Sequence, residues 1–204
     1  MARTTETVEQ RRERLIAVAR DLIAHEGVAA CTFRRLAAAA GTSTRPFTHA
    51  FGTRDNLLRA VALGTWSESP IDVHSAVAVI ERPADWDCVE ELLEIGEHWL
   101  PLDEERALAE RVYVEIQLFA LNHPELHEML LGFSFAANAV MAQLIGEGQR
   151  RGQVRTDVAA DDLVMSFWGL YDGLGLTGIY EPTALPPERL QRIWRDGLGR
   201  LLRP

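Results

Sequence analysis

The apolar residues of this chain recur at spacings of three and four along almost its whole length. Stretches in which apolar and polar residues alternate, as half-buried strands require, are scarce. The 204 residues contain no internal repeat and no low-complexity segment. The spacing therefore predicts an all-α fold, and the hydrophobic content of 47% is ordinary for a soluble globular protein.

Four helices are predicted in the first third of the chain. Glycine favours the end of a helix, while Ser, Thr and Asp favour its start. The predicted helices are Thr7 to His25, ended by Gly27; Phe33 to Ala39, capped by Thr32; Ser43 to Phe51, capped by Ser43 with Pro46 in the first turn; and one with Asp55 in its first turn that runs to Trp66.

The remainder of the chain is also predicted to be helical. The stretch from Glu68 to Pro83 has two prolines and mixed polarity, which predicts a loop or a frayed helix. It separates a head, residues 1–66, from a body, residues 67–204. The predicted body helices are Trp86–Leu100, Asp103–Asn122, Pro124–Arg151, Asp161–Tyr180 and Pro187–Leu202.

Charge is distributed unevenly between these two parts. Residues 1–64 contain ten arginines and six acidic residues, a net charge of +4, whereas the rest carries −13 of the total of −9. All 21 basic residues are arginines. A basic head on an acidic body localises attraction for phosphate at one end of the chain.

Cysteine usage and hydropathy bear on the compartment. The two cysteines, Cys31 and Cys88, lack the spacing of metal ligands, which favours a reducing compartment and argues against a disulfide framework or a zinc site. The N-terminus has no signal-peptide pattern, and we find no apolar run of the eighteen or so residues that a membrane span needs. A cytoplasmic protein without membrane contact is expected.

The stretch from Thr32 to Phe51 has the pattern of a helix-turn-helix. Two short helices meet at the tight turn Ala40-Gly41-Thr42, and the second carries small polar and basic residues that fit a major groove about 12 Å wide. An apolar inner face must hold the two helices together. The residues available for it are Phe33, Leu36, Ala37, Ala40, Phe47 and Phe51.

From Arg11 to Leu63 the sequence resembles the TetR family of regulators. The residues that carry the resemblance are the Arg-rich first helix ending at Gly27, then Thr32, Leu36-Ala37, Ala40-Gly41, Ser43, Phe51 and Arg54-Asp55-Asn56-Leu57. The chain departs from the family pattern at Thr42, usually aliphatic, at Thr48, usually Tyr, and at Arg54, usually Lys. The resemblance implies that the second short helix reads DNA, that the last helices pair two subunits, and that a pocket in the body binds a small effector.

The DNA contacts follow from positions in the motif. Thr44 and Arg45 are expected to face base edges, with Arg45 reading guanine. Contacts with phosphate are expected from Thr32, Arg34, Ser43, Thr48, His49 and Arg54. Thr32 and Ser43 could instead serve only as helix caps, and Arg35 is expected to be solvated.

The Asp161–Tyr180 helix is apolar on two faces, so both faces should be buried. One face is expected to meet the body and the other a second subunit, together with the Pro187–Leu202 helix; a central helix in a monomer is the alternative. The predicted dimer interface comprises Trp168, Tyr171, Gly175, Ile179, Leu190, Ile193, Trp194, Leu198 and Leu201.

Aromatic residues with a few polar groups could line an effector cavity, although such residues also form plain core. The candidates are Trp86, Trp99, Tyr113, Ile116, Phe119, Phe133, Asn138, Met141 and Trp168. The expected effector is small and largely apolar. The whole pattern predicts a ligand-responsive transcriptional regulator, a repressor by default, that binds a palindromic operator as a homodimer. The alternative is a helical small-molecule-binding protein or enzyme with an incidental helix-turn-helix.

Three other patterns are explained more simply. Gly173 to Gly178 has the spacing of a dinucleotide fingerprint but follows no strand. His123 and His127 lack a third metal ligand, and Glu94, Glu97 and His98 fit a solvated helix face. No catalytic grouping stands out, so neither enzymatic activity nor a metal or cofactor is expected.

Overall fold

The computed structural model describes residues 6–67 and 82–204, and every regular element in these ranges is a helix. The all-α prediction is confirmed. The chain packs as two compact units: among the described residues, the first comprises 6–67 with 111–127, and the second 82–110 with 128–204. The predicted loop from Glu68 to Pro83 lies almost entirely outside the described residues.

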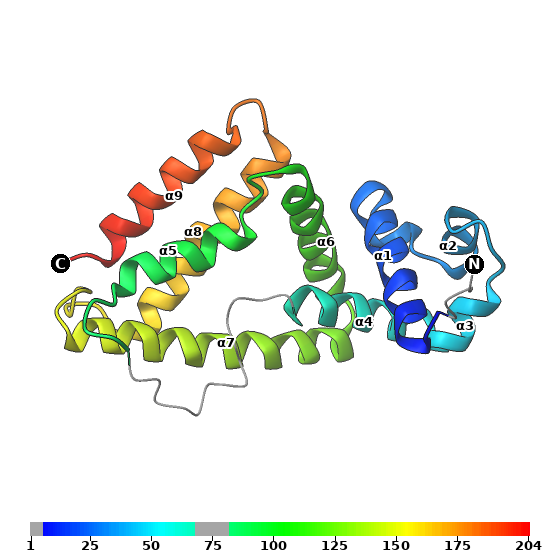
Figure 1. Cartoon of the computed structure of the whole chain (residues 1–204), viewed down its shortest axis with the longest axis horizontal. Helices are drawn as coiled ribbons and strands as arrows, with labels where there is room; N and C mark the ends of the chain where they lie inside the picture. The colour runs from blue at the N-terminus through cyan, green and yellow to red at the C-terminus, as the bar shows by residue number, and fades with distance from the viewer. Residues whose placement is uncertain (1–5, 68–81) are drawn as a thin grey trace, which may run out of the picture. The chain divides into compact units, whose positions relative to one another are not determined.

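The first unit begins with a well-capped helix. The side chain of Thr7 accepts a hydrogen bond from the Gln10 N–H at 3.1 Å, and the Gln10 side chain accepts one from the Thr7 N–H at 3.0 Å. This reciprocal capping box satisfies N–H groups that have no partner within the helix. Gly27 ends the helix with a φ of 80°, which glycine adopts readily. The elements of the unit (Figure 1) are α1 (Val8–Glu26), the 3₁₀ helix η1 (Val28–Ala30), α2 (Phe33–Ala39), α3 (Arg45–Phe51) and α4 (Arg54–Ser67).

The start of α3 differs from the prediction. The helix begins at Arg45, and Thr44 occupies the cap position with helical φ and ψ of −70° and −17° and no side-chain cap hydrogen bond. A cap side chain normally accepts from the N–H of the second or third helical residue, and the second is Pro46, which has no N–H. The prediction that Ser43 caps this helix is therefore wrong. The sequence also gave no sign of η1.

The second unit contains α5 (Cys88–Trp99), the first part of α6 (Glu104–Ala120), most of α7 (Pro124–Arg150), α8 (Ala160–Tyr180) and α9 (Pro187–Leu202). The helix α5 starts two residues later than predicted because Asp87 caps it. The Asp87 carboxylate accepts hydrogen bonds from the N–H groups of Val89 and Glu90 at 2.8 and 3.1 Å. A carboxylate at this position also offsets the positive end of the helix dipole.

The helix α9 packs against α5 and α8 (Figure 1). Every fourth residue of α9 is turned to this contact. Leu190, Trp194, Leu198 and Leu202 are fully buried. The Trp194 indole donates a hydrogen bond to the Leu93 carbonyl at 3.0 Å. A methyl group on Gly96 would lie 2.0 Å from the Trp194 ring, so only glycine permits this approach of α5 and α9. These contacts place the core of the unit between α5, α8 and α9.

Averaged over 18 residues, part of α7 is long and apolar enough to cross a membrane, with a mean hydropathy of 1.6. The sequence prediction used a different criterion, an uninterrupted run of apolar residues. Small and polar residues interrupt such a run in α7. Core helices of soluble proteins meet the same criterion. Along one face of α7 the structure buries Leu130, Ala137, Met141 and Ile145, which is the pattern of a helix packed against other helices.

Candidate functional site

The helix-turn-helix is held by a small aromatic and aliphatic core. Leu36 of α2 and Phe47 of α3 are fully buried, and the rings of Phe33 and Phe47 lie 6.2 Å apart between centroids. At the turn, Gly41 has a φ of 60°, and the Thr42 N–H bonds to the Ala37 carbonyl at 2.9 Å. Because buried side chains fix the two helices, the outer face of α3 is left for contacts with a partner.

That outer face is polar and solvent-exposed. Ser43, Thr44, Arg45, Thr48 and His49 are all exposed. The Thr48 hydroxyl donates to the Thr44 carbonyl at 3.2 Å, which leaves its lone pairs outward. Within the part of the chain that the structure describes, Arg45 has no ion-pair partner, so its guanidinium is available to an incoming group.

The two predicted phosphate contacts on α2 differ in their surroundings. Thr32 is exposed and caps α2, since its hydroxyl accepts from the Arg35 N–H at 3.3 Å. Arg34 is exposed, and no acidic side chain pairs with it among residues 6–67 and 82–204. Arg35, by contrast, forms an ion pair with Glu26 across to α1. Arg35 is exposed, as expected for a solvated side chain, and has an acidic partner within the chain.

Arg54, predicted to contact phosphate, forms hydrogen bonds within the first unit. Its Nη2 donates to the Val28 carbonyl at 2.7 Å and its Nε to the Cys31 carbonyl at 2.8 Å. The guanidinium also lies 5.0 Å from the centroid of the Phe119 ring. The end of η1 exposes carbonyl groups that no helix satisfies, and Arg54 is the donor that reaches them. Its position in the first unit is therefore structural.

Glu115 on α6 also bonds to the backbone of η1, and no sequence pattern pointed to this residue. Its carboxylate accepts the Val28 N–H at 2.9 Å. A Cβ on Gly27 would lie 3.3 Å from the same carboxylate. The contact joins residues 87 positions apart in sequence, which explains why local spacing could not reveal it.

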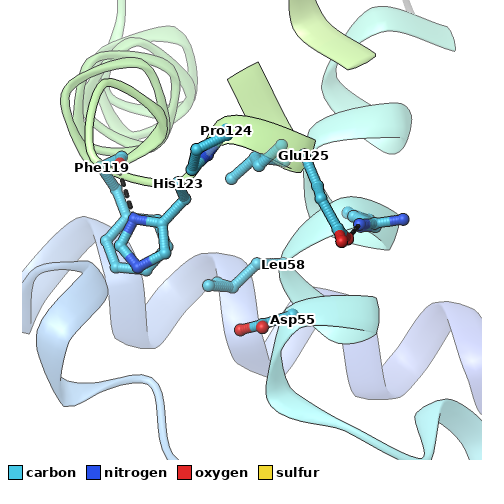
Figure 2. Close-up of a pocket in the computed structure, with 8 residues that line it drawn as sticks. Asp55, Leu58, Phe119, His123, Pro124 and Glu125 are labelled. Atoms are coloured by element: carbon cyan, nitrogen blue, oxygen red, sulfur yellow. Dashed lines mark hydrogen bonds and ion pairs between the residues drawn. The ribbon is translucent and has the colours of Figure 1, made fainter. Parts of the chain in front are cut away.

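A cavity of about 260 Å³ lies in the first unit beside α4 (Figure 2). The rings of His123 and Phe119 stack with their centroids 3.5 Å apart, and the His123 Nδ1 is 2.7 Å from the Phe119 carbonyl. Glu125 is paired with Arg59 at its rim. The lining residues are Asp55, Leu58, Arg59, Phe119, His123, Pro124, Glu125 and Leu126. Of the predicted effector residues, only Phe119 is among them.

A second group of predicted effector residues meets in the second unit. The rings of Trp99 and Trp168 stack at 5.7 Å, and the Trp168 indole donates to the Asn138 side-chain oxygen at 2.7 Å. The Tyr171 ring stands edge-on to Trp99 at 6.0 Å and to Trp168 at 5.9 Å. The Tyr171 hydroxyl donates to Glu110 at 2.7 Å, and Glu110 is a residue that the sequence analysis did not single out.

The other predicted effector residues are distributed over both units. Tyr113, Ile116 and Phe119 belong to the first unit. Trp86 lies under the guanidinium groups of Arg82 and Arg151, at 5.4 and 5.2 Å. Met141 is fully buried, and Phe133 is half-buried. Which of the nine candidates line an effector cavity stays a prediction, because helical spacing does not tell core positions from a pocket wall.

Five of the nine predicted dimer residues are buried within one chain, and four are half-buried. Tyr171, Gly175, Leu190, Trp194 and Leu198 are buried and have no surface left for a second subunit. The half-buried members are Trp168, Ile179, Ile193 and Leu201. Both apolar stripes of α8 contain buried residues, and Trp168, Leu170 and Leu174 in them are half-buried. The exposed face of α8 instead carries Met165, Leu176 and Tyr180, which are 53%, 50% and 79% exposed.

An all-helical chain with an exposed polar helix on a buried helix-turn-helix core belongs to the class of DNA-binding regulators. Residues 15–61 match the family model of bacterial regulatory proteins of the tetR family, and residues 89–203 match that of the BetI-type transcriptional repressor C-terminal domain. The second match alone covers more than half of the chain. The chain therefore belongs to the TetR family of transcriptional regulators.

Solved structures of similar fold agree. A transcriptional regulator from Rhodococcus sp. Rha1 is 24% identical over 93% of this chain and 95% of its own, with a TM-score of 0.77. A putative regulator from Saccharomonospora viridis in complex with choline is 21% identical, with coverages of 95% and 98% and a TM-score of 0.80. NalD, a repressor from Pseudomonas aeruginosa, is 16% identical, with coverages of 96% and 98% and a TM-score of 0.70. At these identities the likeness shows the fold. A search of curated proteins finds no match.

Proposed function

We propose that this TetR-family regulator is a repressor that binds a palindromic operator as a homodimer and releases it when a small molecule binds the second unit. The observation that carries the DNA-binding part is the outer face of α3. Its polar residues are exposed while Phe47 and Phe51 on the opposite face are buried. A helix with this division can enter the major groove without giving up its own packing.

Within this proposal, some of the exposed residues contact base edges and the others contact phosphates. Arg45 and Thr44, at the start of α3, face base edges, and the fork of the Arg45 guanidinium matches the two acceptors of guanine. Thr32, Arg34, Ser43, Thr48 and His49 contact phosphates and set the register. Arg54 is left out of the contact set because its donors serve backbone carbonyls.

A homodimer is proposed through the outer face of α8. Met165, Leu176 and Tyr180 expose apolar surface there, and around Gly169 and Gly173 on the same helix a Cβ would meet no atom within 4 Å. Small residues beside exposed apolar ones allow a second helix to approach closely. Two-fold pairing would place two copies of α3 on half-sites about 34–36 Å apart, one turn of duplex.

The effector is placed in the second unit, near the paired tryptophans. The choline complex of the Saccharomonospora viridis relative supports the idea that this fold admits a small molecule. A ligand that binds one arrangement of the dimer better than the other shifts the population between them, and thereby the DNA affinity.

The test is binding to DNA from the region upstream of the chain's own reading frame, followed by fluorescence anisotropy. A scrambled duplex of the same composition is the control. We expect a preference for the native duplex and a logarithmic affinity that falls linearly as the logarithm of salt rises between about 50 and 200 mM. Equal binding to both duplexes at every salt concentration would favour the alternative, a helical ligand-binding protein or enzyme with an incidental helix-turn-helix.

A further inference from the structure

The cavity beside α4 is built entirely within the first unit, the unit that contains the helix-turn-helix. Its walls come from the start of α4 and from the residues that join α6 to α7. Both segments belong to one compact unit, so their side chains define a single site. At about 260 Å³ the cavity is smaller than the pockets that hold drug-sized ligands, and it suits a molecule built on one ring.

Apolar side chains form a large part of the wall. The aliphatic part comes from Leu58, Pro124 and Leu126. The stacked rings of Phe119 and His123 form the aromatic part. In Figure 2 the side chains of Leu58 and Asp55 point from α4 toward the side on which these two rings lie. The cavity therefore offers apolar contact to a small planar molecule.

The ring of His123 carries a free hydrogen-bond acceptor. Its Nδ1 lies 2.7 Å from the Phe119 carbonyl oxygen. A carbonyl oxygen can only accept, so Nδ1 carries the proton in this contact. In the neutral ring the other nitrogen, Nε2, then has a lone pair and no proton. No described residue donates to Nε2, which is left to accept a hydrogen bond from a bound molecule.

Two carboxylates add further acceptors. Asp55, in the first turn of α4, is exposed, and no side chain in the described part of the chain pairs with it. Glu125 pairs with Arg59 through its Oε2, which leaves its Oε1 able to accept. Arg59 is the one arginine among the lining residues, and Glu125 engages it. The cavity thus presents mainly acceptors and an excess of negative charge.

This distribution of groups selects between classes of ligand. An anion, or a molecule with acceptors only, would meet these acceptors without compensating donors, which is unfavourable. A cation with several N–H groups supplies the missing donors, and hydrogen bonds between charged groups are the stronger ones. The apolar wall requires that this cation also have a flat apolar part.

We infer that the cavity is a binding site for a planar cation with several N–H donors, an amidinium or guanidinium group on a small apolar ring. The N–H groups donate to the carboxylates of Asp55 and Glu125 and to the His123 Nε2, and the ring packs on the aliphatic wall. The site is separate from the effector site proposed in the second unit. The competing explanation is a groove that holds only water.

Calorimetric titration of the full chain with benzamidine, an aromatic amidinium ion, tests the inference. Benzamide has the same ring but no charge, and a carbonyl oxygen replaces one of its NH₂ groups, so it is the matched control ligand. We expect saturable binding of benzamidine and at least tenfold weaker binding of benzamide. Asp55→Asn, which keeps the shape and removes the charge, should weaken benzamidine binding at least tenfold. Glu13→Gln, an exposed acid on α1 outside the cavity, should leave it unchanged.

Glu125→Gln is the second variant, because it removes another acceptor charge and frees Arg59 to repel a cation. It should also weaken benzamidine binding at least tenfold. Thermal unfolding without ligand shows whether each variant is folded, and if Asp55→Asn is not, Glu125→Gln decides in its place. The inference is overturned if benzamidine does not bind, if benzamide binds equally well, or if the folded variant binds benzamidine like the parent chain.

Binding of operator DNA, measured on the same samples, keeps this inference apart from the proposed function. Intact operator binding without benzamidine binding would sink this inference alone. Benzamidine binding that depends on Asp55, in a chain that does not bind the operator, would sink the proposed function alone.

Discussion

At the scale of single residues, the surroundings of an arginine decide its role, as two arginines nine positions apart show. Both are basic residues in the helix-turn-helix region, and the sequence assigned both to DNA. Arg45 is exposed and unpaired among the described residues, whereas Arg54 donates to the carbonyls of Val28 and Cys31. A guanidinium with two of its N–H groups engaged in short hydrogen bonds stabilises the fold, and its removal would leave buried acceptors unsatisfied.

Arg45→Ala should weaken binding to the native operator by about 1–3 kcal/mol and relax base preference at one position of each half-site. The reason is the loss of a two-pronged hydrogen bond to a base edge. Fluorescence anisotropy at one fixed salt concentration measures it, with exposed Arg111→Ala on α6 as the control. Operator affinity that is unchanged in Arg45→Ala would remove this residue from the contact set.

Glu110 should give the stability of the chain a pH dependence. Burial of its side chain raises its pKa from the ordinary 4.5 to about 7 in the folded chain, so the folded state holds the proton more tightly. The protonated form is therefore stabilised on folding. This contribution is fully present below about pH 4.5 and is lost as the pH rises through about 7, in total about 3 kcal/mol.

Urea unfolding at pH 5 and pH 8 measures this effect. The parent chain should lose more stability over that interval than Glu110→Gln, which cannot titrate. Tyr171 and Asp172 both act on the Glu110 carboxyl, and both remain in the variant. Parallel pH profiles for the two proteins would show that Glu110 does not titrate in this range.

At the scale of elements, capping and spacing predicted the helices well where the determinants are local. The bounds of α2 and α9 agree with the prediction to the residue, since Thr32 and the prolines at 186 and 187 mark the starts. The start of α3 was misplaced because Pro46 removes a donor that a cap would use. The element η1 was missed because its carbonyls depend on Arg54, a partner more than twenty residues away.

At the scale of elements, the prediction concerns the outer face of α8 as the proposed dimer interface. Leu176→Arg should convert the proposed dimer into a monomer, because a charge replaces apolar surface at the centre of the face. Light scattering coupled to size exclusion at micromolar concentration measures the mass. Leu131→Arg on α7, another Leu about half exposed, is the control and should leave the mass unchanged. A parent chain that is already monomeric would contradict the dimer itself.

At the scale of the whole molecule, packing does not follow the order of the chain. The first unit takes residues 111–127 from α6 and α7 in addition to the N-terminal helices. The helix α6 thus carries Glu110 in one unit and, five residues later, Glu115 in the other. The uneven charge, +4 on residues 1–64 against −13 on the rest, fits a chain that attracts phosphate at one end.

The amino-acid sequence by itself determined the helical class, most helix bounds and the polar face of α3, because periodicity, caps and turns act over a few residues. Only the tertiary structure decided which aromatics meet, which residues of the two α8 stripes are buried, that Arg54 bonds to backbone carbonyls, and that Glu110 is buried beside Gly175. Those outcomes depend on contacts between residues tens of positions apart. Helical spacing predicts that a side chain is buried, and only the packing of the helices shows which residues it contacts.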